Sequence, residues 1–328
     1  MLRETKGSFK LKGKLVGLGS EFAFRTGESG TEQYRSVKIG VKTSKDNTVN
    51  VTLFGMTGGE ITVIQSTTKE QRAAGKTGDK KKLPFSERRN VPKGYFPVGN
   101  FAKIKTSVGQ TAPDNVHNYD AVNVIQNEFS DDETVYISGN IRYNTYTNKD
   151  GNTVKQRELI IGSIFKEKDI DFDDAKFEEL CSFNQDIIVK EVETDDDAKK
   201  TLLYAFTVDY SGKYEETEFV IDDTNTRFLA NIKKRFKFGD TAKVVGVVLN
   251  KPIIDDTVDE EEEDEFGGYV PKGQSKQNIK GWISEFRITG VVPNSYNEKV
   301  YSESDFISDD PFDGSAKVEF DEDDDPFA

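Results

Sequence analysis

The stretch TVYISGNIRYNTYTNKDGNTVKQRELIIGSI, residues 134–164, decides what kind of fold this chain can form. Apolar and polar side chains alternate on both sides of NKDGN, residues 148–152, whose glycine and asparagines are typical of a tight turn. The stretch therefore predicts two long antiparallel strands joined as a hairpin. Val135, Ile137 and Ile141 share one face of the first strand, and we expect them in the core.

A second hairpin is predicted upstream. The segments YRSVKIGVKTS, residues 34–44, and TVNVTLFG, residues 48–55, flank a short KDN turn and follow a first strand near residues 9–19. Their alternation places on the core face Val37, Ile39, Val41, Val49, Val51 and Leu53. The opposite face carries Tyr34, Lys38, Lys42, Asn50, Thr52 and Phe54. Half of that face is aromatic or basic, which a solvated sheet face does not require.

A basic insert of about residues 66–113 separates these two hairpins. It shows no sustained period, so it is expected to be irregular, and residues 69–105 hold eleven Lys and Arg against three acids. Loops of this length are rare in compact domains unless they bind something or are disordered. Its densest basic clusters are residues 80–82 and 88–89, for which a solvated loop is the alternative interpretation.

The second half repeats a five-stranded order. Strands are predicted at residues 183–193, 201–211, 213–222, 239–250 and 281–293, with a helix over 224–236 capped by Thr224 or Asn225. Trp282 and Phe286 on the last strand are expected in the core. Five strands with a helix between the third and fourth describe an oligonucleotide/oligosaccharide-binding (OB) barrel. The first half fits the same order with the basic insert in place of the helix.

The predicted fold class is therefore all-β, with two five-stranded Greek-key OB barrels in tandem. The first barrel is assigned to residues 1–168 and contains the basic insert. The second is assigned to residues 169–293 and contains an acidic loop at about 255–273. Residues 294–328 have the composition of a disordered acidic tail.

Composition narrows the function further. Cys181 and His117 are the only residues of their types, so an internal disulfide is excluded and a structural zinc site lacks ligands. His117 lies in the polar segment PDNVHNYD and is expected in a solvated loop, so no catalytic residue and no cofactor is predicted. There is no apolar run of about 18 residues and no signal-peptide pattern, so a cytoplasmic protein without a membrane partner is expected.

The charge is divided between the two ends of the chain. The net charge is −14, yet residues 1–165 hold 25 Lys and Arg against 17 Asp and Glu. Residues 255–265 hold nine acids without a base, and residues 303–325 hold eleven acids with one base. The net negative charge of the whole chain argues against a nucleic-acid partner. The net positive charge of residues 1–165 nevertheless allows this part of the chain to bind nucleic acid.

Residues 134–164 closely resemble the fourth and fifth strands of bacterial and phage single-stranded DNA-binding proteins. TLFG, residues 52–55, and the acidic end DEDDDPFA, residues 321–328, resemble other parts of that family, although its usual tip ends on phenylalanine and here Ala328 follows Phe327. The resemblance implies a non-enzymatic protein that coats and protects single-stranded DNA without sequence specificity, in replication, recombination and repair. The second barrel and the insert favour a phage-type protein.

Single-strand binding requires a cationic groove with aromatic faces on which bases stack. The stacking candidates are Tyr34, Phe54, Tyr143 and Tyr146. The phosphate-binding candidates are Lys38, Lys42, Lys80, Lys81, Lys82, Arg88, Arg89, Arg142, Lys149, Lys155 and Arg157. For Phe54 the alternative is a core position, and for Tyr143 and Tyr146 it is ordinary cross-strand packing.

The acidic tail is the candidate site for protein partners, namely replication and recombination proteins. A phenylalanine that follows acids occurs twice, in SDDPF at residues 308–312 and again near the end. The ring would enter a pocket whose basic rim meets the carboxylates. The candidate residues are Phe312, Asp323, Asp324, Asp325, Pro326 and Phe327. A tail that only improves solubility is the alternative.

Two other functions remain open at this level. Acidic pairs such as Asp173–Asp174 or Asp222–Asp223 would bind magnesium in a nuclease, although they are more typical of helix or strand caps. A host-directed interaction protein could instead use its acidic tail as a nucleic-acid mimic. The second barrel has an acidic balance and is expected to serve structure or protein contacts. The sequence leaves open a homo-oligomer, the length of the binding site and a preference for DNA over RNA.

Overall fold

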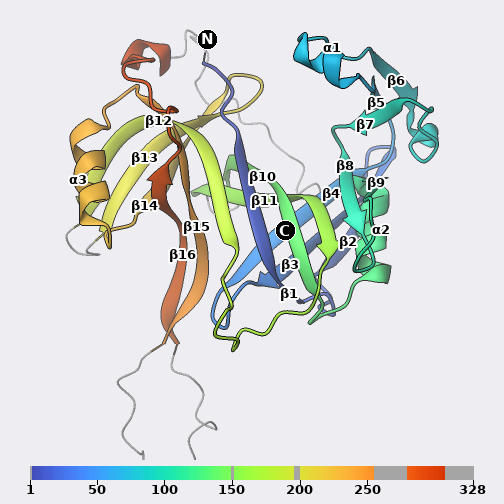
Figure 1. Cartoon of the computed structure of the whole chain (residues 1–328), viewed down its shortest axis with the longest axis horizontal. Helices are drawn as coiled ribbons and strands as arrows, with labels where there is room; N and C mark the ends of the chain where they lie inside the picture. The colour runs from blue at the N-terminus through green and yellow to red at the C-terminus, as the bar shows by residue number, and fades with distance from the viewer. Residues whose placement is uncertain (1, 149–150, 196–199, 255–278, 307–328) are drawn as a thin grey trace, which may run out of the picture.

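The computed structural model describes residues 2–148, 151–195, 200–254 and 279–306, most of them in β-strands (Figure 1). An all-β class was predicted, and the described residues are mostly β-strand with a smaller share of helix, so the β character of the prediction is confirmed. Two closed rings of strands lie side by side, and a small sheet projects from one of them. No helix in these ranges is long and apolar enough to cross a bilayer.

The first ring consists of five strands. They are β1 (Gly7–Val16), β3 (Glu32–Lys42), β4 (Thr48–Met56), β10 (Thr134–Thr147) and β11 (Thr153–Lys166), and β2 (Phe24–Ser29) extends the sheet beside β3. Strand β1 pairs antiparallel with β3 and β10, each hairpin pairs antiparallel within itself, and a parallel contact between β11 and β4 closes the ring.

The predicted faces of both hairpins are confirmed. Val37 lies opposite Leu53 and Ile39 opposite Val51, and all four side chains are buried. The three core residues predicted on β10 are buried as well. Alternation therefore assigned the inner and outer walls of the ring correctly, because one face of each strand packs inward and the other meets solvent.

Helix α2 (Asn118–Glu128) lies between β4 and β10, so the expectation that the insert replaces this helix is wrong. The helix packs against β4 at Gly55. A Cβ atom at Gly55 would lie 2.1 Å from the backbone nitrogen of Tyr119, so only glycine lets the first turn of α2 approach this closely. Sequence reasoning missed the helix because its segment is rich in asparagine and has a weak apolar pattern.

The basic insert is folded, which corrects the expectation of an irregular segment. It contains β6 (Lys80–Pro84), β7 (Tyr95–Val98) and the short helices α1 (Lys69–Ala73) and η1 (Phe85–Glu87). Its two strands pair with β5 (Glu60–Gln65), which directly precedes the insert, in the order β6-β5-β7. Ile61, Val63 and Leu83 form its own small core. These strands escaped prediction because each is short and β6 buries a single residue, Leu83.

A hairpin follows the small sheet and joins the first ring. It is formed by β8 (Phe101–Lys105) and β9 (Asp114–His117), and β8 pairs parallel with β11. Ala102 and Ile104 are buried in the main core. The insert is therefore anchored to the ring at both of its ends.

The second ring repeats the pairing of the first. Its elements are β12 (Cys181–Asp195), β13 (Lys200–Val208), β14 (Tyr214–Ile221), α3 (Thr226–Arg235), β15 (Thr241–Ile254) and β16 (Ile279–Val291). Strand β12 pairs with β13 and β15, and a parallel contact between β14 and β16 closes the ring. The five strands and the helix are as predicted, and the Asn225 side chain caps α3 by accepting from the backbone nitrogen of Phe228.

One core assignment in this ring is wrong. Phe286 is 8% exposed, as expected, but Trp282 is 61% exposed. Trp282 pairs with Pro252 on the part of β15 and β16 that extends beyond the ring, below it in Figure 1. Alternation predicts which face of a strand a side chain lies on. It does not predict whether that part of the strand lies over a core or extends beyond it, and this decides whether the side chain is buried.

Residues 294–306 are packed against the second ring, so the tail does not begin at Asn294 as expected. The Tyr296 ring stacks on Phe236 with centroids 5.6 Å apart. The Phe306 ring, in η2 (Glu303–Phe306), stacks on Phe206 with centroids 4.4 Å apart. These aromatic contacts hold the segment although its composition is polar.

Asn47, in the turn between β3 and β4, is buried and connects the two rings. Its side-chain nitrogen donates to Glu179 Oε1 at 2.9 Å and to the carbonyl oxygen of Val248 at 3.0 Å. Its side-chain oxygen accepts from the backbone nitrogen of Asn250 at 2.7 Å. The β3–β4 turn, which the sequence predicts only as a tight connection between two strands, is thus held to the second ring.

We predict that Asn47→Ala lowers the free energy of unfolding by about 1–3 kcal/mol, because it leaves buried donors and acceptors without partners. Asp46→Ala, at the exposed neighbouring position, should change it by less than about 0.5 kcal/mol. Urea unfolding of both variants checks this. Equal midpoints for Asn47→Ala and Asp46→Ala would show that the contact contributes nothing to stability.

Candidate nucleic-acid interface

The outer face of β3 and β4 brings together the candidates predicted there. The rings of Tyr34 and Phe54 stack with centroids 5.8 Å apart and an angle of 25° between their planes. Lys38 lies directly opposite Thr52, two residues along each strand from Ser36 and Phe54. Tyr34 and Phe54 are half-buried and Lys38 is exposed. The face therefore offers aromatic surface next to a cation.

The two lysines of this face differ from their neighbour Lys14 in their ion pairing. Lys42 lies opposite Lys14 of β1, and it is Lys14 that pairs with Asp169, at 3.2 Å. Within the described ranges, none of the ion pairs involves Lys38 or Lys42. An anionic backbone could approach both ammonium groups without displacing a carboxylate.

Tyr143 and Arg157 lie between the two rings rather than on open surface. The Tyr143 hydroxyl donates to Gln185 Oε1 at 3.2 Å, and burial raises the pKa of this tyrosine. The Arg157 guanidinium lies 4.2 Å from the centroid of Phe286 and donates to Thr217 Oγ1 at 2.9 Å. Burial lowers the pKa of Arg157. Both side chains hold the rings together, so we leave them out of the proposed binding surface.

The remaining candidates on β10 and β11 are distributed along the arm of the hairpin. Lys155 pairs with Glu216 of the second ring at 3.5 Å, and Arg142 pairs with its cross-strand neighbour Glu158 at 2.7 Å. Tyr146 is 44% exposed. Lys149 lies outside the described residues.

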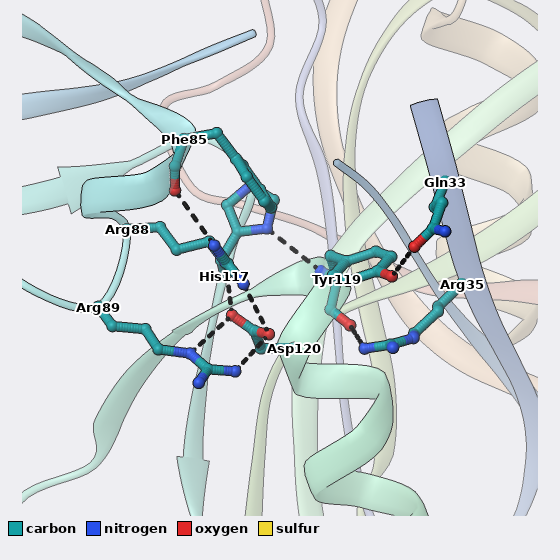
Figure 2. Close-up of polar contacts among 8 residues, drawn as sticks. All are labelled: Gln33, Arg35, Phe85, Arg88, Arg89, His117, Tyr119 and Asp120. Atoms are coloured by element: carbon teal, nitrogen blue, oxygen red, sulfur yellow. Dashed lines mark hydrogen bonds and ion pairs between the residues drawn. The ribbon is translucent and has the colours of Figure 1, made fainter. Parts of the chain in front are cut away.

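In the insert, the two basic clusters differ in surroundings. Lys80, Lys81 and Lys82 are exposed on β6, and Lys82 pairs with Glu60 of β5 at 3.0 Å. Arg88 and Arg89 instead reach across to Asp120 in the first turn of α2 (Figure 2). Arg88 is therefore largely buried against the first ring, whereas the Arg89 side chain remains 71% exposed.

Asp120 is the point at which the insert is fastened to the first ring. Its carboxylate accepts from Arg88 Nε and from Arg89 Nη2, each at 2.7 Å, and the Arg88 guanidinium stacks 4.0 Å from the Phe85 centroid. Burial alone would raise the pKa of Asp120, but the hydrogen bonds and charges of the two arginines outweigh it and lower the pKa.

His117 is buried beside this ion pair, so the expectation of a solvated loop is wrong. Only 6% of its surface is exposed, and the rings of Phe85 and Phe101 meet it edge-on at 5.0 and 5.1 Å. Its Nδ1 accepts from the backbone nitrogen of Tyr119 at 3.3 Å and caps α2 (Figure 2). Burial lowers the pKa of His117, against the opposing effect of Asp120.

Tyr119 extends the same network to β3. Its hydroxyl donates to Gln33 Oε1 at 2.9 Å, and the Arg35 guanidinium lies 4.0 Å from its ring centroid (Figure 2). Sequence reasoning missed Arg35, Tyr119 and Asp120. The sequence did contain a signal for this network. Alternation places Arg35 on the same inward face as Val37, and a cation on that face needs an interaction partner.

The partner-binding candidates Phe312, Asp323, Asp324, Asp325, Pro326 and Phe327 lie outside the described residues. In the described part of the chain, no group of three His, Cys, Asp or Glu side chains could hold a metal ion. Asp222 accepts from the backbone nitrogen of Thr224 at 3.1 Å and so serves the turn before α3.

We predict that low pH reduces the folding stability of this protein through His117. Because the pKa of His117 is lower in the folded than in the unfolded protein, its contribution to the free energy of unfolding is complete above the unfolded pKa of about 6.5. That contribution is lost as the pH falls below this value. His117→Asn keeps a capping acceptor and does not titrate. Between about pH 7.5 and pH 5.5 the wild type should lose more unfolding free energy than His117→Asn. Parallel losses in urea titrations would contradict this.

Comparisons with known proteins give a family and, at low identity, similar solved structures, two of which are described here. No curated protein matches the chain. Wild-type single-stranded DNA-binding protein from Thermus aquaticus is similar at 9% identity and a TM-score of 0.37, over 76% of this chain and 87% of that chain. A deletion mutant of that protein is similar at 11% identity and a TM-score of 0.36, over 79% and 100%. The YorF family matches residues 8–310, and this chain therefore belongs to the YorF family.

Proposed function

We propose that this protein binds single-stranded DNA without sequence specificity, as a coating protein rather than an enzyme, through the outer face of β3 and β4. The observation that carries the proposal is the stacked pair Tyr34–Phe54 beside the exposed Lys38, which has no ion pair with any residue that the structure describes. A base that stacks on an aromatic side chain contributes about 1–3 kcal/mol whatever its identity, and cations that follow the backbone add a salt-dependent term.

The insert extends this surface. Strand β5 begins at Glu60, shortly after β4 ends at Met56, so the small sheet is rooted beside the Tyr34–Phe54 pair. Three consecutive exposed lysines on β6, Lys80 to Lys82, add positive charge there. The Asp120 contacts of Arg88 and Arg89 hold the sheet in place, so we assign those arginines a positioning role.

We further propose that both rings are OB folds and that the second is structural. Each ring closes through a parallel contact between its third and fifth strands, with a helix before the fourth. Glu216 and Thr217 of the second ring already bind Lys155 and Arg157 of the first. The second ring therefore supports the β10–β11 hairpin instead of offering a cationic groove of its own.

The double variant Tyr34→Leu with Phe54→Leu should weaken binding to oligo-dT by about 1–3 kcal/mol for each base that it unstacks, which is about 5- to 150-fold in Kd. Leucine preserves apolar bulk, so the melting temperature should change little. Fluorescence anisotropy with labelled oligo-dT measures the effect. Tyr210→Leu is the matched control, because Tyr210 is 90% exposed on the second ring. If the double variant binds as tightly as this control, the β3–β4 face is not the binding surface.

For the acidic tail we propose recruitment of replication and recombination proteins. Phe312 and Phe327 each follow acids, and a ring that enters a pocket while carboxylates meet a basic rim gives fast and specific association. Two copies raise the effective concentration at one partner. Because Phe306 packs against Phe206, the part that can serve as a free ligand begins after it.

Removing residues 308–328 takes away nine acids and one base, so oligo-dT affinity should stay unchanged or become tighter. Capture of replication and recombination proteins should be lost. Phe312→Ala with Phe327→Ala should lose the partners without changing DNA affinity. Pull-down from extract and anisotropy on the same preparations test both statements. If the double variant still captured these proteins fully, the two phenylalanines would not be needed and the tail would act through its charge alone.

A further inference from the structure

A second surface on the first ring combines lysines with aromatic rings, and we call it the lysine–aromatic strip. It lies on the outer face of β1, β10, β11 and β8, on the other side of the β4–β11 contact from Tyr34 and Phe54. Its members are Lys10, Lys12, Lys103, Lys105, Tyr136 and Phe165. None of them was predicted from sequence, because they come from four strands that only the register brings together.

The register aligns these side chains in two rows. Lys12 lies opposite Tyr136, Tyr136 opposite Phe165, and Phe165 opposite Lys105. The neighbouring row begins at Lys10 and ends at Lys103, with Ser138 and Ser163 between them. Residues opposite one another on paired strands share a face, so all of these side chains lie on the same outer wall.

The centre of the strip is aromatic. Tyr136 and Phe165 stack with centroids 6.1 Å apart and an angle of 22° between their planes. Lys105 Nζ lies 5.2 Å from the Phe165 centroid. Both rings are half-buried, so part of each remains open to solvent. Cations at the corners and aromatic faces at the centre are the two components that single-strand binding combines.

The spacing of the four lysines suits an extended polyanion. Three strand spacings separate the ends of a row, which is about 14 Å, and two residues along a strand separate the rows, which is about 7 Å. Among the described residues, no ion pair involves any of these four lysines.

Two acids near the strip are already in ion pairs. Asp169 pairs with Lys14 at 3.2 Å, and Glu133 pairs with Lys166 at 2.8 Å. Elsewhere on the same hairpin a cation faces an acid directly, as Arg142 faces Glu158. The four lysines of the strip, which have no ion pair among the described residues, repel one another although the chain has a net charge of −14. An anionic ligand bound to the strip would reduce this repulsion.

We propose that the lysine–aromatic strip is a second contact surface for single-stranded DNA, so that one strand passes from the β3–β4 face around the ring onto the strip. This inference rests on the proposed function, because it assigns a further segment of the same ligand. The phosphates contact the four lysines, and bases stack against Tyr136 and Phe165. The length of DNA occluded by one protein is then greater than the β3–β4 face alone can cover.

The test compares Lys12→Gln with Lys105→Gln against a control of equal charge, Lys234→Gln with Lys237→Gln, at exposed positions on and after α3. Phe165→Leu tests stacking separately. Labelled oligo-dT of about 8 nucleotides fits within one OB-sized site, and oligo-dT of about 35 nucleotides exceeds it. Affinity for both lengths is measured at several salt concentrations, and melting temperatures confirm folding.

For the long oligonucleotide, the strip lysine variant should bind at least about tenfold more weakly than the control. Its salt slope should be lower by about 1.4, from two lost phosphate contacts. Phe165→Leu should weaken binding of the long strand without changing the salt slope. Binding of the short strand should be little affected by either variant.

A strip lysine variant that binds the long strand as tightly as the control overturns the inference. Wild-type protein that binds neither length overturns the proposed function itself, whereas binding that depends only on Tyr34 and Phe54 leaves that function standing.

Discussion

Strand β1 fixes the arrangement of the whole molecule, because three other strands pair with it. Its first half lies between β10 and β12, so that Phe9 is opposite both Gly139 and Phe183, and its second half pairs with β3. One strand thus belongs to the first ring and joins it to the second. Most buried apolar side chains of the two rings belong to one hydrophobic cluster as a result, while Ile188, Phe206 and Val208 of the second ring form a separate one.

This shared strand determines which residues are available for function. Because the rings are held side by side, the β10–β11 hairpin packs against β14, and Tyr143 and Arg157 become part of the contact between rings. The Asn47 contact fixes the other side of the same junction. The aromatic and basic side chains on the outer walls of β3–β4 and of β1–β10–β11 remain exposed or half-buried.

A second constraint places the insert. Two arginines, one aspartate and a buried histidine meet at the start of α2, where Gly55 permits close approach of the helix to β4. The charge of the buried Asp120 carboxylate is compensated by Arg88 and Arg89, and the Arg89 side chain remains largely exposed, where water solvates the remaining positive charge. The small sheet is thereby held beside the proposed surface although its own core contains only three fully buried side chains.

Sequence alone determined the features that depend on local periodicity. The two hairpins, their inner and outer faces, the five strands of the second half and helix α3 follow from alternation, turn residues and capping, all of which act over a few neighbouring residues. The pairing of Tyr34 with Phe54 on one outer face was predictable for the same reason. The basic front of the chain, and with it the class of ligand that we propose, could also be inferred from the sequence.

Only the tertiary structure decided what depends on contacts between distant segments. The burial of His117, the folding of the insert, the exposure of Trp282, the packing of Phe306 and the roles of Tyr143 and Arg157 all rest on partners far away in the chain. The lysine–aromatic strip is the clearest case, because its six residues come from four strands. Alternation gives the parity of a side chain, but the register and the neighbouring ring decide whether that side chain meets solvent, a core or a partner.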